Sequence, residues 1–285
     1  MVQERGMALV TGASSGIGRE VAIRLAKRGF RVIGAARRMD RLNQLASQYG
    51  NIIPKKVDLS DSENVEALCR YILEYPKPIS VLVNNAGYSI RGALEDVPVS
   101  DVRRLFEVNL FALIRITQAC LPGMRKQRNG TIVNLSSVAG KFAFPMSGVY
   151  AATKHAVEAI SDALRAEVRP FGIRVITIRP GAIATEFNEV ANRLTGDLMA
   201  RTYPDYKPLY ESSGAAIGRI FSQFTIPGPG IIADLIEEIV LSETPKPVYT
   251  AGPLVKEFLE PRLKMDDEAF DKYMAEKTGL MGLQV

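Results

Sequence analysis

The chain has 285 residues, 47% of them hydrophobic and 24% charged, and its 36 basic against 31 acidic side chains give a formal net charge of +5 at pH 7. Nine of the basic and only three of the acidic side chains lie in residues 1–41, where Phe30 is the only aromatic residue. This local excess of positive charge lacks the aromatic side chains that usually accompany it in a nucleic-acid-binding surface, so we expect no nucleic-acid binding. The length and composition favour a globular protein with one large α/β domain or two of average size.

Short β-branched runs alternate along the chain with amphipathic stretches of helical length. The runs that predict strands are 7–10, 31–35, 52–57, 81–84, 131–135, 174–178 and 247–251. Apolar residues recur at i, i+3, i+4 and i+7, which predicts helices, in 16–28, 39–49, 62–74, 102–125, 150–169 and 233–241. Apolar strands separated by crossover helices are typical of a parallel sheet covered on both faces. The sequence therefore predicts a doubly wound α/β fold of about seven strands, with helices on both faces.

Two segments depart from this alternation. Residues 186–230 have weak periodicity, no strand-like run and six aromatic residues. A segment of that length inside a compact domain is more often functional than a plain connection, so we expect a substrate lid. Residues 253–285 form a charged amphipathic tail broken at Pro261, which we expect to fold as one or two helices on the rim. Residues 1–285 are thus expected to form a single domain with these two additions.

The composition also limits the chemistry and the location of the protein. One histidine, His155, and two cysteines, Cys69 and Cys120, exclude a His/Cys zinc cluster of the usual ligand count, and a Ser-His-Asp hydrolase could use only His155. The cysteines lie in apolar helical stretches, so we expect buried thiols in a reducing compartment, the cytoplasm. Arg115 interrupts the longest apolar stretch, so we expect no transmembrane segment. Because the predicted strand at 7–10 begins so early, we expect no signal peptide.

The first predicted strand runs into the sequence TGASSGIG, residues 11–18, and then into a helix. Glycines at such a place allow a tight turn, so that backbone amides and the helix N-terminus can face a pyrophosphate. Gly12, Gly16 and Gly18 form GxxxGxG, whereas the common dinucleotide pattern is GxGxxG and a mononucleotide P-loop ends in GK[ST]. Because Arg19 and Glu20 follow Gly18, the loop favours a dinucleotide over a nucleoside triphosphate.

The end of the second predicted strand indicates which dinucleotide is bound. In NAD-binding proteins a carboxylate at this place accepts hydrogen bonds from the ribose, but here Arg37 and Arg38 end the strand and Asp40 is the first acidic residue. A guanidinium group can instead pair bidentately with the 2′-phosphate of NADP. The sequence therefore predicts NADP(H), with NAD(H) as the less favoured alternative. We expect Arg37 to bind the phosphate and Arg38 to be the substitute candidate.

With these elements in order, the chain resembles the short-chain dehydrogenase/reductase family in its non-extended form. TGASSGIG matches the family's cofactor loop, Asn84-Asn85-Ala86-Gly87 matches its NNAG motif, and Pro180-Gly181 with Thr185 matches its PGxxxT segment. The resemblance covers about residues 6–252. It implies a Rossmann-like sheet, an NADP(H)-dependent dehydrogenase or reductase with a small-molecule substrate, and a homodimer or homotetramer formed through the helices at 102–125 and 150–169.

The family's signature is YxxxK with a serine thirteen residues before the tyrosine. The chain contains three YxxxK matches, which begin at Tyr150, Tyr203 and Tyr273, so the pattern alone is weak. Only the first has a serine, Ser137, at the required distance; the others have a valine and a glutamate there. The first match also follows the fifth predicted strand, where a parallel sheet presents its crevice. The resemblance therefore singles out Ser137, Tyr150 and Lys154.

Residues i and i+4 share a helix face, so Lys154 can hold its ammonium group near the Tyr150 hydroxyl. A phenol titrates near 10 and a nearby cation lowers its pKa; a shift to neutrality would take about 4 kcal/mol, since one pKa unit is about 1.36 kcal/mol. By resemblance, Tyr150 is the general acid in carbonyl reduction and the base in the reverse reaction. Ser137, rather than Ser136, would position the carbonyl oxygen, and Asn109 would support a water relay from Lys154.

The resemblance also implies the cofactor contacts. Lys154 would bind the nicotinamide ribose, Asp58 the adenine and Thr185 the carboxamide, although an aspartate before a serine is equally a helix-entry residue. His155 points about 100° away from Lys154 on its helix, and we expect it to serve packing or a subunit interface. The full set of expected cofactor contacts is Gly12, Ser14, Ser15, Gly16, Ile17, Gly18, Arg37, Arg38, Asp58, Asn85, Ala86, Gly87, Tyr150, Lys154, Pro180, Gly181, Ile183 and Thr185.

The sequence favours one of three candidate functions. The leading hypothesis is an NADP(H)-dependent carbonyl reductase or alcohol dehydrogenase. Residues 92–187 resemble 17β-hydroxysteroid dehydrogenase-like, retinol dehydrogenase-like and acyl-dihydroxyacetone-phosphate reductase-like members, and an aromatic lid suits a bulky apolar carbonyl compound. The alternative is a non-catalytic NADP(H)-binding sensor or scaffold, against which the complete set of Ser137, Tyr150, Lys154 and Asn109 argues. A sugar-nucleotide epimerase of the extended type would have a TGxxGxxG loop, which this chain lacks.

Overall fold

The computed structural model describes residues 5–283, in which seven strands form one sheet. The strands lie side by side in the order β3-β2-β1-β4-β5-β6-β7, and every neighbouring pair is parallel. The order reverses between β1 and β4, which is where a doubly wound sheet opens a crevice at the carboxyl ends of its strands. The predicted fold class is confirmed. The strands are β1 (Gly6–Thr11), β2 (Phe30–Ala36), β3 (Ile52–Lys56), β4 (Ile79–Asn84), β5 (Gly130–Leu135), β6 (Ile173–Pro180) and β7 (Val248–Ala251).

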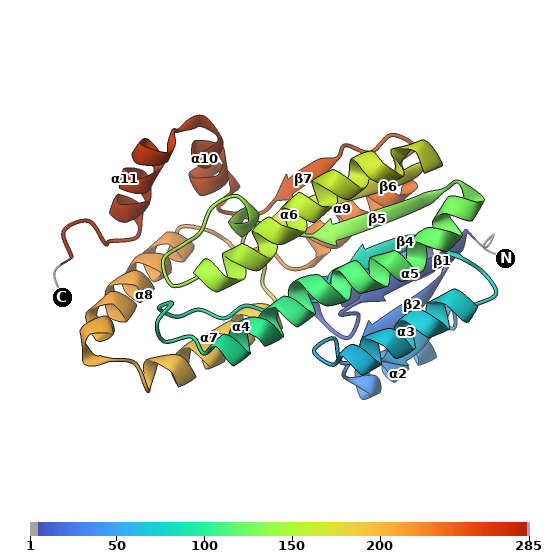
Figure 1. Ribbon diagram of the computed structural model, residues 1–285, viewed down its shortest axis with the longest axis horizontal. Helices are drawn as coiled ribbons and strands as arrows, with labels where there is room; N and C mark the ends of the chain where they lie inside the picture. The colour runs from blue at the N-terminus through green and yellow to red at the C-terminus, as the bar shows by residue number, and fades with distance from the viewer. Residues whose placement is uncertain (1–4, 284–285) are drawn as a thin grey trace.

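Helices cover both faces of the sheet. Alternate residues of a strand point to opposite faces. Ala8 and Val10 of β1 pack with α1 (Gly16–Lys27), α2 (Met39–Gln48) and α9 (Gly230–Leu241), whereas Met7 and Leu9 pack with α3 (Ser62–Glu74) and α5 (Ala112–Gln127). Helix α6 (Gly148–Val168) lies beside α5 on that second face and ends in the short turn η3 (Arg169–Phe171). Figure 1 shows α3, α5 and α6 in front of the sheet and α9 behind it.

The helix predicted at 102–125 is part of a longer run with a π-helical turn inside it. Helix α4 (Val99–Phe106) continues through η1 (Glu107–Phe111) into α5. By length and composition this run is the one helix within residues 5–283 that could cross a membrane, but half of its most apolar window is buried inside the protein. Its buried residues pack against α3 and the sheet. The run therefore serves as a core helix of the α/β sandwich.

The segment at 186–230 is largely helical, which the sequence did not predict. It contains α7 (Glu186–Met199), the turn η4 (Pro204–Tyr206) and α8 (Lys207–Ser222). Helices α7 and α8 each bury only two or three side chains, such as Ala191 and Leu198 of α7. Because so few positions are buried, the apolar residues of this segment show only a weak helical period. In Figure 1, α7 and α8 lie with the tail at the end of the molecule toward which the strands point.

The tail folds as η5 (Val255–Leu259), α10 (Glu260–Lys264) and α11 (Asp267–Lys277), and Pro261 lies in the first turn of α10 rather than in a break. Aromatic rings attach the tail to the loop that follows β5. The ring centroid of Phe258 lies 5.8 Å from that of Phe142 and 4.8 Å from that of Phe144, and Phe270 lies 6.0 Å from Phe142. The tail therefore packs next to η2 (Val138–Gly140), the turn that follows Ser137.

Candidate active site

Three of the predicted side chains meet where β5 ends and α6 begins. Ser137 follows β5, and its hydroxyl accepts a hydrogen bond from the backbone N–H of Ala139 at 3.1 Å, which starts η2. Tyr150 lies in the first turn of α6 and its side chain is hydrogen-bonded to that of Ser137. Lys154 lies one turn further along, with Nζ 5.9 Å from the centroid of the Tyr150 ring. The strand end and the helix start thus bring two hydroxyls and an ammonium group together.

Burial controls the protonation of Tyr150 and Lys154. It raises the pKa of Tyr150 to about 12, although the hydrogen bond with Ser137 and the positive charge of Arg91 act in the opposite direction. It lowers the pKa of Lys154 to about 8, although the carboxylate of Glu158 raises it. The lowered pKa expected for Tyr150 is therefore not found, because lost hydration outweighs the neighbouring positive charge. At pH 7 the phenol is protonated, which is the form that a general acid requires.

Lys154 and Asn109 are held in place by backbone groups. The Lys154 ammonium group donates to the carbonyl of Leu135 at 2.7 Å. Asn109 lies in the π-helical turn η1, donates from Nδ2 to the carbonyl of Tyr88 at 2.9 Å and accepts at Oδ1 from the Tyr88 N–H at 3.1 Å. A Cβ on Gly87 would lie 3.1 Å from Asn109 Oδ1 and 3.7 Å from Lys154 Nζ. The glycine of the NNAG motif therefore lets the loop pass close to both side chains.

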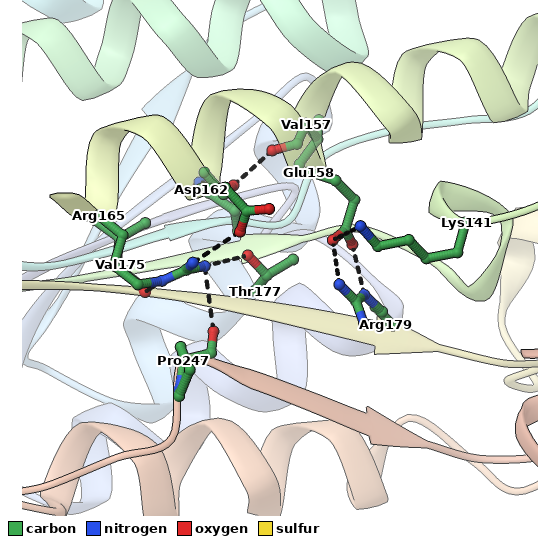
Figure 2. Close-up of polar contacts among 11 residues, drawn as sticks. Lys141, Val157, Glu158, Asp162, Arg165, Val175, Thr177, Arg179 and Pro247 are labelled. Carbon is green, nitrogen blue, oxygen red and sulfur yellow. Dashed lines mark hydrogen bonds and ion pairs between the residues drawn. The ribbon is translucent and has the colours of Figure 1, made fainter. Parts of the chain in front are cut away.

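Helix α6 is fixed to β6 by a buried ion pair, shown in Figure 2. Glu158, one turn after Lys154, is 2% exposed. Its carboxylate accepts from Arg179 of β6 at 2.9 Å (Nε to Oε1) and 2.6 Å (Nη2 to Oε2), and Lys141 Nζ lies 3.5 Å from Oε2. Two turns further along α6, Arg165 donates to a backbone carbonyl of β6 at 2.9 Å. These contacts hold the helix on the sheet and so fix the position of its first two turns.

The glycine loop after β1 is packed tightly against the loop after β4. Gly12 has a φ of +71°, a conformation that favours glycine. A Cβ on Gly18 would lie 2.5 Å from both Asn85 Nδ2 and the carbonyl oxygen of Gly12. Asn85 donates from its backbone N–H to Thr11 Oγ1 at 3.0 Å and from Nδ2 to the Thr11 carbonyl at 2.9 Å, and the N–H of Ala86 also donates to Thr11 Oγ1 at 3.1 Å. The two motifs therefore form one packed unit.

Arg38 lies on this glycine loop. Its guanidinium group donates to Ser14 Oγ at 3.3 Å, to Ser15 Oγ at 2.6 Å and to the Glu186 carboxylate at 2.6 Å. The second oxygen of Glu186 accepts from Arg41 at 2.5 Å. Two guanidinium groups thus bind one carboxylate, and the two loop hydroxyls accept hydrogen bonds from one of these guanidinium groups. This set of donors fits a phosphate group, because guanidinium groups bind carboxylates and phosphates with the same fork geometry.

Arg37 and Asp58, also expected to contact the cofactor, lie outside this cluster. The Arg37 side chain is exposed. Asp58 Oδ1 accepts from the backbone N–H of Ser60 at 3.0 Å and from its hydroxyl at 2.8 Å. Partial burial raises the pKa of Asp58, but these hydrogen bonds and the charges of Arg37 and Arg104 outweigh it, so the net shift is downward. Asp58 is therefore ionised at neutral pH, with Oδ1 already bonded to the helix-entry turn.

The end of β6 brings the last predicted contacts over the glycine loop. A Cβ on Gly181 would lie 1.5 Å from the carbonyl oxygen of Pro253, so only glycine fits there. Thr185 caps α7, since its hydroxyl accepts from the Phe187 N–H at 3.3 Å, and a Cβ on Gly16 would lie 3.3 Å from Thr185 Cγ2. Three further residues expected to contact the cofactor have side chains that are buried or partly buried. They are Ile17, Pro180 and Ile183.

The other YxxxK pairs and the histidine lie apart from this arrangement. Tyr203 is 59% exposed, just before η4. Tyr273 lies on α11 and donates to the carbonyl of Glu257 at 2.6 Å. His155 is exposed on α6 with Nδ1 2.9 Å from the carbonyl oxygen of Ala151. Of the three pairs, only Tyr150 and Lys154 face the serine at the end of β5.

Comparison with known proteins identifies the family. Residues 6–194 match the family model described as short chain dehydrogenase. The chain belongs to the short-chain dehydrogenase family. It is 36% identical over 204 residues to the dehydrogenase/reductase SDR family member 7B of Xenopus laevis, a match that covers 68% of this chain and 62% of that relative, less than two thirds of its length.

Two solved structures of short-chain dehydrogenases are similar over nearly the whole chain. The one from Streptomyces avermitilis has a TM-score of 0.80 and 30% identity, and the match covers 99% of this chain and 100% of that one. The one from Sphingobium yanoikuyae, in complex with NADPH, has a TM-score of 0.71 and 26% identity, with 98% and 96% covered. The similarity therefore extends over α8 and the tail, beyond the region of the family model, which ends within α7.

Three charged residues at the site of this short-chain dehydrogenase were not predicted from the sequence: Arg41, Glu186 and Arg91. Arg91 lies four residues after the NNAG glycine and donates to the side-chain oxygens of Asn188 at 2.9 Å and Asn192 at 3.3 Å, both on α7. Burial lowers its pKa, which the nearby Tyr150 opposes. Within residues 5–283 no carboxylate forms an ion pair with it. Its position just after β4 was the only signal that could have indicated it.

Proposed function

We propose that this protein is an NADP(H)-dependent oxidoreductase that acts on a carbonyl compound or the corresponding alcohol. The observation that carries this proposal is the group of Ser137, Tyr150 and Lys154 at the carboxyl end of β5, combined with an arginine-lined glycine loop after β1. Both lie along the crevice at the carboxyl ends of the strands, the usual ligand site of an open parallel sheet.

The side chains divide the chemistry between them. Ser137 and Tyr150 would together hold the carbonyl oxygen of the substrate, since their side chains are already hydrogen-bonded to each other. The Tyr150 proton would pass to that oxygen in reduction and return in oxidation. The pKa of Tyr150, raised by burial to about 12, keeps the proton in place at neutral pH. The charges of Lys154 and Arg91 would stabilise the phenolate that forms as the proton leaves.

The choice of NADP(H) rests on the fit of the loop. Arg38 and Arg41 already donate to the Glu186 carboxylate, and Arg38 also donates to the hydroxyls of Ser14 and Ser15. A 2′-phosphate offers oxygens of the same kind as the carboxylate. We assign Arg38 to this phosphate in preference to Arg37, because Arg38 also contacts the loop serines. When bound, NADP(H) would supply or accept the hydride. The similar protein from Sphingobium yanoikuyae is in complex with NADPH, which supports NADP(H) over NAD(H).

For the substrate we propose a bulky apolar ketone or aldehyde, of steroid-, retinoid- or lipid-like character. The Phe187 ring of α7 lies 5.8 Å from the Tyr150 ring at an interplanar angle of 63°. Val138 and Phe142, just after Ser137, belong to an apolar cluster that includes tail residues such as Phe258. Apolar side chains therefore lie next to the Tyr150 ring and just after Ser137 in the chain. Segment 186–230 would act as the lid of a single domain.

A cofactor-oxidation screen tests this function. NADPH oxidation is measured with aldehydes, small ketones, ketosteroids, retinal and acyl-dihydroxyacetone phosphate, and repeated with NADH. We expect turnover of at least one class, faster with NADPH. Tyr150→Phe should reduce turnover at least about a hundredfold, because it removes the general acid, and should bind NADPH as the wild type does.

Each part of the proposal can fail separately. Equal or faster rates with NADH would contradict the cofactor preference. Turnover that survives in Tyr150→Phe would contradict the catalytic assignment. NADPH binding without turnover of any carbonyl class would favour the alternative, a non-catalytic NADP(H)-binding sensor or scaffold.

We also propose that the protein forms a homodimer or homotetramer through α5 and α6. Apolar residues, among them Leu121, Ile160 and Leu164, line a groove of about 210 Å³ between these helices. Ile160 is 38% exposed and Phe111, at the start of the same face, 49%.

The free thiols of Cys69 and Cys120 are buried, which is consistent with a reducing compartment, and we propose the cytoplasm.

A further inference from the structure

Three charged side chains from distant parts of the chain meet beside the glycine loop. Glu186 is the first residue of α7, whereas Arg38 and Arg41 lie at the start of α2. One oxygen of the Glu186 carboxylate lies 2.6 Å from Arg38 Nη1 and the other 2.5 Å from Arg41 Nη1. These hydrogen bonds lower the pKa of Glu186, and the bond from Arg41 has the larger effect. At neutral pH the carboxylate is therefore ionised and bound by both arginines.

This carboxylate also lies against the groups expected to bind the cofactor. The same Arg38 guanidinium donates to the hydroxyls of Ser14 and Ser15 in the glycine loop. The neighbour of Glu186, Thr185, packs on the loop so closely that a Cβ on Gly16 would lie 3.3 Å from its methyl carbon. The start of α7 thus lies over the loop, with its negative charge on the arginine pair.

We propose that Glu186 is an internal anion that competes with the 2′-phosphate of the cofactor for Arg38 and Arg41, and so limits the preference for NADPH over NADH. This inference rests on the proposed function. NADPH must displace the carboxylate from both arginines, whereas NADH, which has no 2′-phosphate, leaves the ion pairs intact. If the pairs are closed nine-tenths of the time, the apparent Kd for NADPH is about tenfold weaker than with open arginines.

The same exchange would transmit cofactor binding to the lid. The two residues after Glu186 are Phe187, whose ring lies 5.8 Å from that of Tyr150, and Asn188, which accepts a hydrogen bond from Arg91. Release of Glu186 removes the ionic anchor of this first helical turn. A phosphate bound at the glycine loop would therefore loosen the part of α7 that covers Tyr150, before the substrate enters.

A charge-neutral variant with a matched control tests the competition. Glu186→Gln removes the competing charge. Glu189→Gln makes the same change one turn later on α7, where the side chain is exposed. Binding of NADPH, NADH, 2′,5′-ADP and 5′-AMP to the full chain is measured by calorimetry. We expect Glu186→Gln to bind NADPH and 2′,5′-ADP about tenfold more tightly, with NADH and 5′-AMP unchanged, and Glu189→Gln to match the wild type.

Other outcomes overturn the inference. Weaker or unchanged NADPH binding in Glu186→Gln would show that the carboxylate does not compete. An equal gain for NADH and 5′-AMP, or an equal gain in Glu189→Gln, would show a general charge effect. If the wild type prefers NADPH and Arg38→Gln removes that preference while Glu186→Gln changes nothing, only this inference fails. If the wild type binds NADPH and NADH equally and Arg38→Gln alters neither, the proposed NADP(H) preference itself fails.

A second measurement needs no variant. Hydrogen exchange of the backbone amides of residues 187–190 is followed in the wild type at saturating 2′,5′-ADP and 5′-AMP. We expect 2′,5′-ADP, which carries the 2′-phosphate, to speed exchange in this turn relative to 5′-AMP. Equal or slower exchange would overturn the coupling to α7.

Discussion

Lys154 is the group in the candidate site whose ionisation lies nearest to neutral pH. Burial lowers its pKa to about 8, and the Glu158 carboxylate one turn later raises it. Below pH 8 the ammonium form predominates and can stabilise negative charge on Tyr150. We therefore expect the rate of carbonyl reduction to fall as the pH rises through about 8. Glu158→Gln should move this fall to lower pH, because a buried lysine without its carboxylate loses its proton more readily.

The pH–rate profiles of the wild type and two variants check this prediction. Asp162→Asn is the control, because it removes a carboxylate from the same helix. The Asp162 side chain is 53% exposed and forms an ion pair with Arg165. We expect its profile to match that of the wild type. An alkaline limb in Glu158→Gln that is unchanged, or that moves to higher pH, would contradict the role given to Glu158.

Arg91 acts on the other proton, that of Tyr150. Its positive charge lowers the pKa of the phenol, against the larger effect of burial. Arg91→Gln should therefore raise this pKa further. Alcohol oxidation, which needs the phenolate as base, should then require a higher pH, with about tenfold less phenolate for each pKa unit gained. Oxidation rates as a function of pH measure the shift; a profile unchanged in Arg91→Gln would exclude this electrostatic effect.

The residues that could be predicted from the sequence are those fixed by local spacing. Tyr150 and Lys154 lie one turn apart on one helix, and Ser137 lies at the end of the strand just before it. Glu186 and Arg41 are 145 residues apart, and nothing in either neighbourhood indicates that they meet. The raised pKa of Tyr150 was missed for a related reason, since burial depends on every segment that packs around the phenol.

At the scale of elements, the site depends on how α6 is attached to β6. Arg179 holds Glu158 with two hydrogen bonds, and the Glu158 side chain is only 3% exposed. Arg179→Leu should reduce the free energy of unfolding by about 3–5 kcal/mol, because it leaves a buried carboxylate whose one remaining ion-pair partner within residues 5–283 is Lys141. The double variant Glu158→Leu, Arg179→Leu should lose less than the sum of the single variants, since no buried charge is then unpaired. Urea unfolding of all four proteins measures the coupling; additive losses would contradict it.

The elements differ in how well their sequence predicts them. Helices that lie on the sheet, such as α1 and α3, bury one continuous face, and their apolar period is clear. Helices α7 and α8 touch the rest of the protein through a few side chains and through polar contacts, such as those of Asn188 with Arg91 and of Tyr210 with Asp96. A pattern based on apolar residues therefore misses them.

At the scale of the whole molecule, the charge excess of residues 1–41 is divided between two tasks. Arg24 and Arg28 form ion pairs with Asp234 and Glu237 of α9 and so join α1 to its neighbour on the sheet. Among the described residues 5–283, Arg38 and Arg41 form ion pairs only with Glu186 of α7, at the proposed phosphate site. The net charge of +5 is therefore not spread evenly over the surface. Much of the positive excess in residues 1–41 lies in ion pairs between α1 and α9 or at one anion site.

The exposed apolar face of α5 and α6 is the remaining large-scale feature. Burying apolar surface of this kind is the main driving force of subunit association, and Ile160 lies in the groove between the two helices. A glutamate at its centre would place an unpaired charge in a subunit contact. We therefore expect Ile160→Glu to reduce the molecular mass measured by light scattering to that of a smaller species. Leu263→Glu makes a similar change at a side chain of α10 that is 63% exposed and should leave the mass unchanged. A monomeric wild type, or equal masses for the wild type and Ile160→Glu, would contradict an assembly built on this face.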